Sequence, residues 1–484
     1  MKSYRQTKIV ATVGPASDSA EMLNALMEAG ADVFRLNFSH GDHRNKSEVI
    51  QHIRKISKER QRAVAILGDL QGPKIRTGVM VDGMMQLVTG EEVTITTRDI
   101  EGKDRLIPTT YQQLPGDVTV GDTILLDDGL LELQVLSAEE SEVRCRVIVG
   151  GPLKDRKGIN LPGVKVSAPA LTDKDIEDLE FCIAEEVDYI ALSFVRTADD
   201  VVDLKNRLGA SRASIGLIAK IEKPEAVENF DEILAVADGI MVARGDLGVE
   251  IRPEKVPLIQ KSIIRRCNVA GKPVITATQM LESMIGNPRP TRAETSDVAN
   301  AILDGTDAVM LSAETAAGQY PVEAIRLMVS VAGDVESDPQ LKASGFHPIS
   351  DVKGYRELPE AIGQAACRTA EAVEAAAILA FTQTGSTAAL VAKYRPGLPV
   401  YAVTPTQAVR RRMALYRGVR SIRVDIEGDT EAQILSVEKS VLGFGELDKG
   451  DVVVITMGSP VSDPGTTNLM KVHRLGTGPF FEVY

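Results

Sequence analysis

The chain has 484 residues, 44% of them hydrophobic and 25% charged, which is typical of a folded globular protein of two or three domains and excludes a fibrous or disordered one. Acidic residues outnumber basic ones by 68 to 55, and the net charge of -13 disfavours binding to nucleic acid or to an anionic membrane. The four cysteines form no C-x-x-C pair, and we find neither an apolar leader nor an apolar segment of membrane length. We therefore expect a cytoplasmic protein.

Short segments rich in β-branched and apolar residues alternate with helical patterns along most of the chain. Their near-continuous apolar character indicates burial on both faces, which is typical of parallel strands. Eight such strands, each followed by a helix, predict an α/β protein with a (β/α)8 (TIM) barrel. The predicted strands span residues 8–13, 32–38, 63–69, 188–194, 214–222, 238–244, 273–278 and 307–312.

The third and fourth predicted strands are separated by a much longer segment than the others. This segment holds strand-like stretches at 92–97 and 142–149, with turn signals at Asp82-Gly83 and Asp128-Gly129. We predict that residues 72–166 form an inserted β-barrel domain, while residues 1–71 and 167–340 form the catalytic barrel. Because the insertion follows a strand, it would lie at the mouth of that barrel as a lid.

A linker is indicated at 336–358, where Asp, Pro, Ser and Gly occur without periodicity. Beyond it, a helical pattern at 359–376 precedes further strand-like segments. Together they predict a third domain, residues 341–484, with an open α/β fold. The strand-like segments of this domain are at 378–382, 400–404, 420–424 and 452–457.

Polar and charged residues occur where several of the barrel strands end, and in this fold the catalytic side chains gather at those carboxyl ends. Glu222 and Asp246 would supply hard oxygen ligands for Mg²⁺ or Mn²⁺, whereas no His/Cys cluster indicates zinc. Each residue alone could be a solvated cap or a surface ion pair, but their gathering on one face favours phosphoryl chemistry. The cations that could neutralise phosphate oxygens are Arg35, Lys74, Arg76 and Lys220.

Six segments resemble the signature sequences of the pyruvate kinase family and occur in the order of that family. They are residues 35–41, 69–78, 220–222, 239–248, 276–284 and 304–315. The similarity extends over essentially the whole chain. It implies a barrel with a lid and a C-terminal regulatory domain, a homotetramer, and transfer of the phosphoryl group of phosphoenolpyruvate to ADP.

The resemblance also implies roles for the residues at the strand ends. Arg35 would bind the phosphate of the substrate, and Lys220 would stabilise the phosphoryl group during its transfer. Glu222 and Asp246 would hold the Mg²⁺. The amides of Gly245 and Asp246 and the hydroxyl of Thr278 would hold the substrate carboxylate. The product enolate would be protonated near Thr278.

The monovalent-cation site of the family is matched by Asn37, Ser39, Asp69 and the carbonyl of Leu70. Many potassium-requiring members carry Glu at the position of Lys74. The site next to the substrate phosphate calls for a positive charge, which either K⁺ or a tethered ammonium can supply. We therefore predict that Lys74 replaces potassium and that the enzyme works without it.

The nucleotide contacts implied by the resemblance are Arg76, Lys157 and His40. In the C-terminal domain, the loop of Thr382, Thr384, Gly385, Ser386 and Thr387 precedes a helical pattern, so amides and hydroxyls would meet at a helix N-terminus. It resembles the family's loop for a phosphorylated activator, with 458–465 as its partner loop. A capped helix start without a ligand is an equal alternative.

Two other functions stay open at this point. A metal-dependent barrel lyase or aldolase acting on pyruvate-type substrates could also use a glutamate and an aspartate on adjacent strands, but it would need neither Arg76 nor Lys157. A catalytically silent effector-binding protein would have no need to keep Lys220, Glu222 and Asp246 together.

Overall fold

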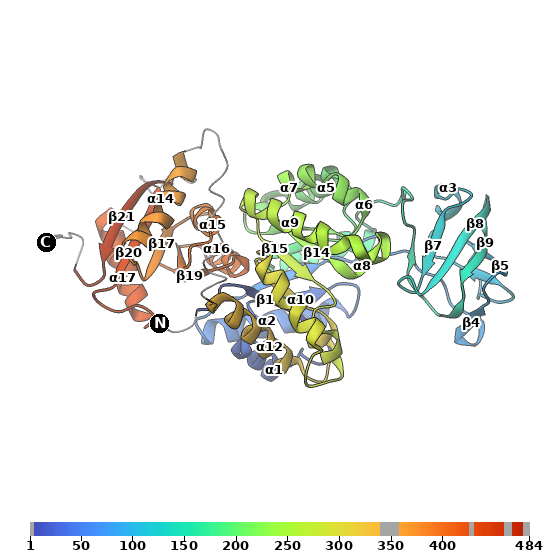
Figure 1. Ribbon diagram of the computed structural model, residues 1–484, viewed down its shortest axis with the longest axis horizontal. Coiled ribbons are helices and arrows are strands. Elements are labelled where there is room, and N and C mark those ends of the chain that lie inside the picture. Colours follow the sequence, from blue (N-terminus) through green and yellow to red (C-terminus); the bar gives the residue numbers. More distant parts are fainter. Residues whose placement is uncertain (1–3, 339–357, 425–429, 459–466, 478–484) are drawn as a thin grey trace.

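The computed structural model describes residues 4–338, 358–424, 430–458 and 467–477. Most of the predicted linker at 336–358 and of the predicted partner loop at 458–465 lies outside these residues. Three domains lie in a row, with the barrel between the inserted domain and the C-terminal domain (Figure 1). Within the described residues, we find no helix with the length and apolar character needed to cross a membrane.

The central domain is a closed barrel of eight parallel strands, as predicted, in the order β1-β16-β15-β14-β13-β12-β3-β2. The predicted strand boundaries agree with the observed ones to within two residues. The strands are largely buried, because side chains fill the inside of the barrel and helices cover its outside. The strands are β1 (Lys8–Val13), β2 (Val33–Asn37), β3 (Ala65–Asp69), β12 (Tyr189–Leu192), β13 (Gly216–Ile221), β14 (Gly239–Ala243), β15 (Val274–Ala277) and β16 (Ala308–Leu311).

The helices around the barrel bury one apolar face against the strands. In α1, for example, Leu23, Leu26 and Met27 recur at helical spacing and are fully buried. Side-chain caps define several helix starts, as in α4, where Thr172 and Asp175 form a capping box. The helices are α1 (Ala20–Ala29), α2 (His43–Glu59), α4 (Asp173–Ala184), α5 (Ala198–Leu208), α6 (Pro224–Glu228), α7 (Phe230–Val236), α8 (Arg244–Glu250), α9 (Val256–Ala270), α10 (Arg292–Leu303), α11 (Ala313–Ala316) and α12 (Pro321–Ser337).

The inserted domain has its own apolar core and is built of strands that pair antiparallel, except for one parallel pair, with one short α-helix, α3 (Leu114–Asp117). Six strands form a sheet in the order β11-β7-β8-β9-β5-β6, and β4 pairs with β10. Arg76 bridges to Gly158 beside β11, and Thr77 bridges to Thr109 beside β6. The segment 76–77 thereby joins the two sheet edges and closes the predicted small barrel. The strands are β4 (Met84–Leu87), β5 (Glu92–Thr96), β6 (Leu106–Pro108), β7 (Thr123–Leu126), β8 (Leu131–Glu139), β9 (Glu142–Val149), β10 (Gly151–Lys154) and β11 (Ile159–Asn160).

The C-terminal domain is an open α/β sheet in the order β19-β18-β17-β20-β21, as predicted except for its last strand. That strand, β21, is antiparallel and only partly buried, and for this reason its sequence gives a weak strand signal. The elements are α14 (Leu358–Ala372), β17 (Ala377–Phe381), α15 (Ser386–Lys393), β18 (Val400–Thr404), α16 (Gln407–Arg412), β19 (Val419–Arg423), α17 (Thr430–Gly443), β20 (Val452–Gly458) and β21 (Thr467–Arg474).

The two flanking domains contact opposite ends of the barrel (Figure 1). At the carboxyl ends of the strands, Asn160 of the inserted domain donates a hydrogen bond of 2.9 Å to Glu250 of α8. At the amino ends, Arg411 of the C-terminal domain pairs with Asp188 at 2.7 Å. The inserted domain thus lies where the predicted catalytic residues are, and the C-terminal domain lies at the other end.

Candidate active site

Lys220, at the carboxyl end of β13, is a buried cation at the centre of the predicted site. Its Nζ donates to Ser193 Oγ at 2.6 Å and lies 2.9 Å from Glu222 Oε1 and 3.3 Å from Asp69 Oδ1. Burial alone would lower the pKa of Lys220, but Asp69 and Glu222 outweigh it and raise this pKa above its ordinary value. The ammonium therefore stays charged and is held in one position.

Asp69, at the end of β3, holds two of the predicted phosphate-binding cations in place. Its Oδ2 accepts a 2.6 Å hydrogen bond from Arg35 Nε, and its Oδ1 lies beside Lys220. Burial acts to raise the pKa of Asp69, but these two cations lower it below its ordinary value. Arg35 also donates to Thr12 Oγ1 at 3.1 Å, so the position of its guanidinium is fixed by two neighbouring strands.

The two carboxylate oxygens of Glu222 have different partners. Its Oε2 accepts from the Phe194 amide at 2.7 Å. Its Oε1 is buried and faces the Lys220 ammonium at 2.9 Å. Burial raises the pKa of Glu222; Lys220 opposes this rise, and the charge of Asp246 adds to it. A second cation beside Oε1 would offset both the burial of the Glu222 carboxylate and the repulsion between Glu222 and Asp246.

A divalent metal fits the Glu222 and Asp246 carboxylates. The side chain of Asp246, in α8, makes no hydrogen bond or ion pair within the described part of the chain. No cluster of three or more His, Cys, Asp or Glu residues occurs there that could hold a metal by itself. Two carboxylates with open positions suit Mg²⁺ or Mn²⁺, which keep waters and substrate oxygens in their coordination shell.

Thr278, just after β15, has a backbone conformation that β-branched residues rarely adopt, with φ at +66°. Its Oγ1 accepts from the Gly245 amide at 2.7 Å and donates to the Ala277 carbonyl at 2.6 Å. Arg244 donates to the Thr278 carbonyl at 2.7 Å and pairs with Asp297. These contacts hold the strained turn and bring together the hydroxyl and the amide that were predicted to bind the substrate carboxylate.

The end of β12 contributes two functional positions that were not predicted. The Ser193 hydroxyl accepts from Lys220 and donates to the Leu70 carbonyl at 2.7 Å, and the Phe194 amide holds Glu222. Ser193 follows Tyr189 and Ala191 at a spacing of two, which places it on the inner face of the barrel. This periodicity is the signal that could have identified it.

Comparison with known proteins identifies the family of this site. Residues 4–325 match the family model "Pyruvate kinase, barrel domain", and residues 360–473 match "Pyruvate kinase, alpha/beta domain". The chain belongs to the pyruvate kinase family. It is 48% identical over 476 residues to pyruvate kinases of Staphylococcus epidermidis and Staphylococcus aureus, which covers 98% of this chain and 81% of each relative. The crystal structure of a pyruvate kinase from Cryptosporidium parvum is similar with a TM-score of 0.90 at 40% identity, covering 97% of this chain and 96% of that one.

The family membership sets the reaction and excludes the two alternatives. The chain is a phosphotransferase of glycolysis, which moves the phosphoryl group of phosphoenolpyruvate to ADP and yields pyruvate and ATP. Its substrates are therefore phosphoenolpyruvate and ADP or ATP, and pyruvate kinases generally use Mg²⁺. Neither a barrel lyase or aldolase nor a catalytically silent protein accounts for these matches.

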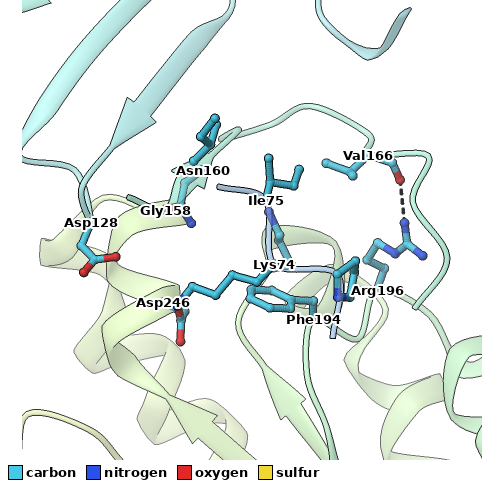
Figure 2. Close-up of a pocket in the computed structure, with 12 residues that line it drawn as sticks. Lys74, Ile75, Asp128, Gly158, Asn160, Val166, Phe194, Arg196 and Asp246 are labelled. Atoms are coloured by element: carbon cyan, nitrogen blue, oxygen red, sulfur yellow. Dashed lines mark hydrogen bonds between the residues drawn. The ribbon is translucent and has the colours of Figure 1, made fainter. Parts of the chain in front are cut away.

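A pocket between the lid and the barrel adjoins the catalytic cluster at Asp246. Figure 2 shows Asp128, Gly158 and Asn160 on the lid side, with Lys74 and Asp246 across from them. The lid is tied to the barrel at the edge of this pocket, where Arg196 donates to the Val166 carbonyl at 2.6 Å (Figure 2). The lid and the barrel thus line the pocket together.

Two of the three predicted nucleotide contacts lie near each other. Partial burial lowers the pKa of His40, and the charges of Arg76 and Lys74 lower it further, so these side chains are neighbours. Lys157 instead pairs with Asp127 at 2.8 Å within the lid. A nucleotide phosphate would have to compete with that carboxylate for Lys157.

Three of the four residues predicted to bind a monovalent cation, Asn37, Leu70 and Asp69, have their oxygens engaged within the protein. Asn37 Oδ1 accepts from the Ser39 amide at 3.0 Å, and the Leu70 carbonyl accepts from Ser193. Both carboxylate oxygens of Asp69 face cations of the site. Lys74 lies with Phe194 and Asp246 at one side of the pocket (Figure 2), and its ammonium makes no ion pair within the described chain.

The predicted activator loop lies between β17 and α15. Gly385, with φ at +98°, begins α15, and its amide donates to Thr382 Oγ1 at 2.8 Å. Thr387 is buried and shares a 2.9 Å hydrogen bond with Thr467. Thr384 and Ser386 contact each other at 3.1 Å near the surface. Of the five predicted residues, Thr382, Gly385 and Thr387 are buried and shape the loop, and Thr384 and Ser386 form its exposed part.

Proposed function

We propose that Glu222 and Asp246 hold the Mg²⁺ or Mn²⁺ of the reaction and that Arg35 and Lys220 bind the phosphoryl group. The placement of the two carboxylates carries this assignment: Glu222 Oε1 is buried beside the Lys220 ammonium at 2.9 Å, and the Asp246 side chain makes no hydrogen bond or ion pair within the described part of the chain. The metal, when bound, neutralises charge on the phosphate oxygens of the substrate.

Lys220 and Arg35 contribute fixed positive charge on the side of the site next to Asp69. Both are held by hydrogen bonds or ion pairs at 2.6–3.3 Å, so little reorganisation is needed when negative charge develops on the transferred group. Thr278 and the neighbouring Gly245 and Asp246 amides would bind the carboxylate of phosphoenolpyruvate. Arg76 and His40, with Lys157 from the lid, would contact the nucleotide.

The test is a coupled assay of pyruvate release from phosphoenolpyruvate, run with and without ADP and with Mg²⁺, Mn²⁺ or a chelator. We expect release that depends on both ADP and the divalent cation. Release without ADP would contradict the kinase assignment, and full activity in the presence of the chelator would contradict the role of the two carboxylates.

We propose that the enzyme needs no potassium because Lys74 supplies the positive charge of the monovalent-cation site. The oxygens of Asn37, Leu70 and Asp69 already have partners in the protein, while the ammonium of Lys74 has none among the described residues. A lysine on the segment that follows β3 can reach toward Asp69 when a phosphate draws it in.

We propose that a phosphorylated metabolite activates the enzyme by binding Thr384, Gly385 and Ser386. Two exposed hydroxyls at the N-terminus of α15 support this role. Ser386→Glu should abolish activation by a phosphate ester and preserve basal turnover, because it places negative charge where the anion would bind. If no phosphate ester shifts the saturation curve of the unmodified enzyme, the loop is only a helix cap.

We also propose a homotetramer that works in the cytoplasm, on the basis of the family. Light scattering on the purified enzyme gives the mass of the assembly. A monomer or dimer at working concentration would contradict the tetramer.

A further inference from the structure

A second cleft lies between the barrel and the C-terminal domain, at the end of the barrel opposite the lid. It is lined by one side of α2, by residues 185–186, by α16, and by Arg423 and Phe444. Neither the catalytic residues nor the activator loop at 382–387 belongs to its lining. Cations from both domains face it, namely Arg54, Lys58, Arg410, Arg411 and Arg423.

Two of these cations share one buried carboxylate. Arg54 and Arg411 pair with Asp188 at 2.9 and 2.7 Å, and the Asp188 side chain is only 1% exposed. They join the barrel to the C-terminal domain at the edge of the cleft. Their charge is therefore used in the structure and is not what a ligand would recognise.

Arg410, in α16, has no such counter-charge among the described residues. Within that part of the chain, its guanidinium donates to two main-chain carbonyls, that of Gln61 at 2.7 Å and that of Ser421 at 3.5 Å. Burial lowers the pKa of Arg410, and the nearby charges of Arg423 and Arg411 lower it further. A half-buried cation beside two others is a place where an anion gains free energy by binding.

Lys58 brings a second uncompensated charge from the barrel side. It is exposed on α2, and its ammonium makes no hydrogen bond or ion pair within the described part of the chain. The acidic residues of the lining are Glu185 and Glu186, and Glu185 accepts a hydrogen bond from Ser47. Within the described residues, the lining of the cleft thus carries more basic than acidic side chains, on a chain whose net charge is -13.

We propose that this cleft binds a small phosphate-bearing anion, with Arg410 and Lys58 as its ligands from the two domains. Arg410 can present its planar guanidinium to two phosphate oxygens, and Lys58 supplies a mobile point charge. Phe444, which is 42% exposed, offers an aromatic surface for the organic part of the ligand. A molecule bound here would fasten the C-terminal domain to the barrel.

The experiment measures binding, so its outcome is independent of the catalytic assignment. Inorganic phosphate and phenyl phosphate are titrated by calorimetry into full-length enzyme carrying Ser386→Glu, and hydrogen–deuterium exchange locates the protected segments. We expect protection at 50–61 and 407–412. Tighter binding of phenyl phosphate than of phosphate identifies an organic phosphate as the ligand class, and equal affinity identifies inorganic phosphate.

Two variants in which a lysine of α2 is replaced by glutamate test the proposal, one inside the cleft and one outside it. Lys58→Glu should weaken this binding by about tenfold or more, whereas Lys55→Glu, an equal charge change on the same helix outside the cleft, should leave it unchanged. Arg410→Gln should also weaken it. If that variant is unstable, the Lys58 variant is the decisive one, because the side chain of Lys58 makes no hydrogen bond or ion pair within the described part of the chain. Equal losses in the Lys55 and Lys58 variants, or protection confined to the active site, would overturn the proposal.

Discussion

Both ends of the barrel carry acidic side chains, but the two ends use them differently. At the amino ends, an aspartate stands immediately before every second strand and accepts a hydrogen bond of 2.7–2.9 Å from a main-chain amide at the start of the preceding strand. Each also pairs with an arginine, so its charge is offset within the protein. The aspartates are Asp32, Asp188, Asp238 and Asp307, and their arginines are Arg62, Arg54, Arg212 and Arg395.

At the carboxyl ends, the carboxylates differ among themselves. Asp69 is paired through both oxygens with Arg35 and Lys220, whereas Glu222 Oε1 has the Lys220 ammonium beside it but no hydrogen bond of good geometry, and the Asp246 side chain has no partner among the described residues. The presence of an aspartate or glutamate therefore does not by itself reveal its role. The two ends of the barrel differ in how many carboxylate oxygens have partners within the protein. Satisfied carboxylates stabilise the barrel, and unsatisfied ones are available to a ligand.

The largest effect on kcat should come from substitutions at the carboxyl ends of the barrel strands. Glu222→Ala or Asp246→Ala should lower kcat by about a thousandfold or more, because each removes a proposed ligand of the divalent cation. The fold should be unchanged, since neither residue belongs to the barrel core, and circular dichroism checks this. Substantial magnesium-dependent turnover in either variant would contradict the metal assignment and, with it, the distinction between the two ends.

A substitution at the amino ends of the strands should lower the stability of the protein and leave its turnover unchanged. Asp188→Asn leaves Arg54 and Arg411 without their buried counter-charge, which should cost about 3 kcal/mol of stability. A lower melting temperature with kcat within about twofold of the original is the expected outcome. Asp203→Asn, which removes an exposed ion pair with Arg207, is the control and should change neither property. A large loss of kcat at full stability would mean that Asp188 has a direct role in turnover.

Lys220 combines the features of the two ends of the barrel. Its ammonium is paired with carboxylates of the protein, and it also lies in the proposed active site. Lys220→Met keeps most of the side-chain stem and removes the charge. It should lower kcat by about a hundredfold, with a smaller effect on KM, since the lost interaction is strongest in the transition state. Steady-state kinetics on the folded variant measure both constants. A near-normal kcat would show that the lysine serves only to pair Asp69 and Glu222.

The sequence allowed most of the barrel and its active end to be predicted, because both depend on local signals. Strands such as β1 and β18 have the predicted boundaries, and charged residues directly after a strand have few places to lie except the barrel mouth. Ser193 escaped prediction because its role depends on Lys220 and Leu70, which are distant in the chain. The aspartates before alternate strands were visible, but neither the amides nor the arginines that they contact could be found by any local pattern.

The smallest effect we predict concerns Lys74. It tests whether the ammonium of this lysine can supply the positive charge of the monovalent-cation site at the carboxyl ends of the strands. In potassium-free buffer with a bulky organic counter-cation, the enzyme should retain full activity. Lys74→Glu removes the ammonium and adds a carboxylate near the proposed cation site, so that variant should gain a potassium stimulation of about tenfold. Lys74→Gln is the matched control, because it loses the charge without offering a new anionic ligand, and it should be slower with only weak potassium stimulation. Strong stimulation of the unmodified enzyme by potassium would refute the role of Lys74. It would mean that Asn37 and Asp69 exchange their protein partners for the ion, so that satisfied oxygens at this end can still bind a ligand.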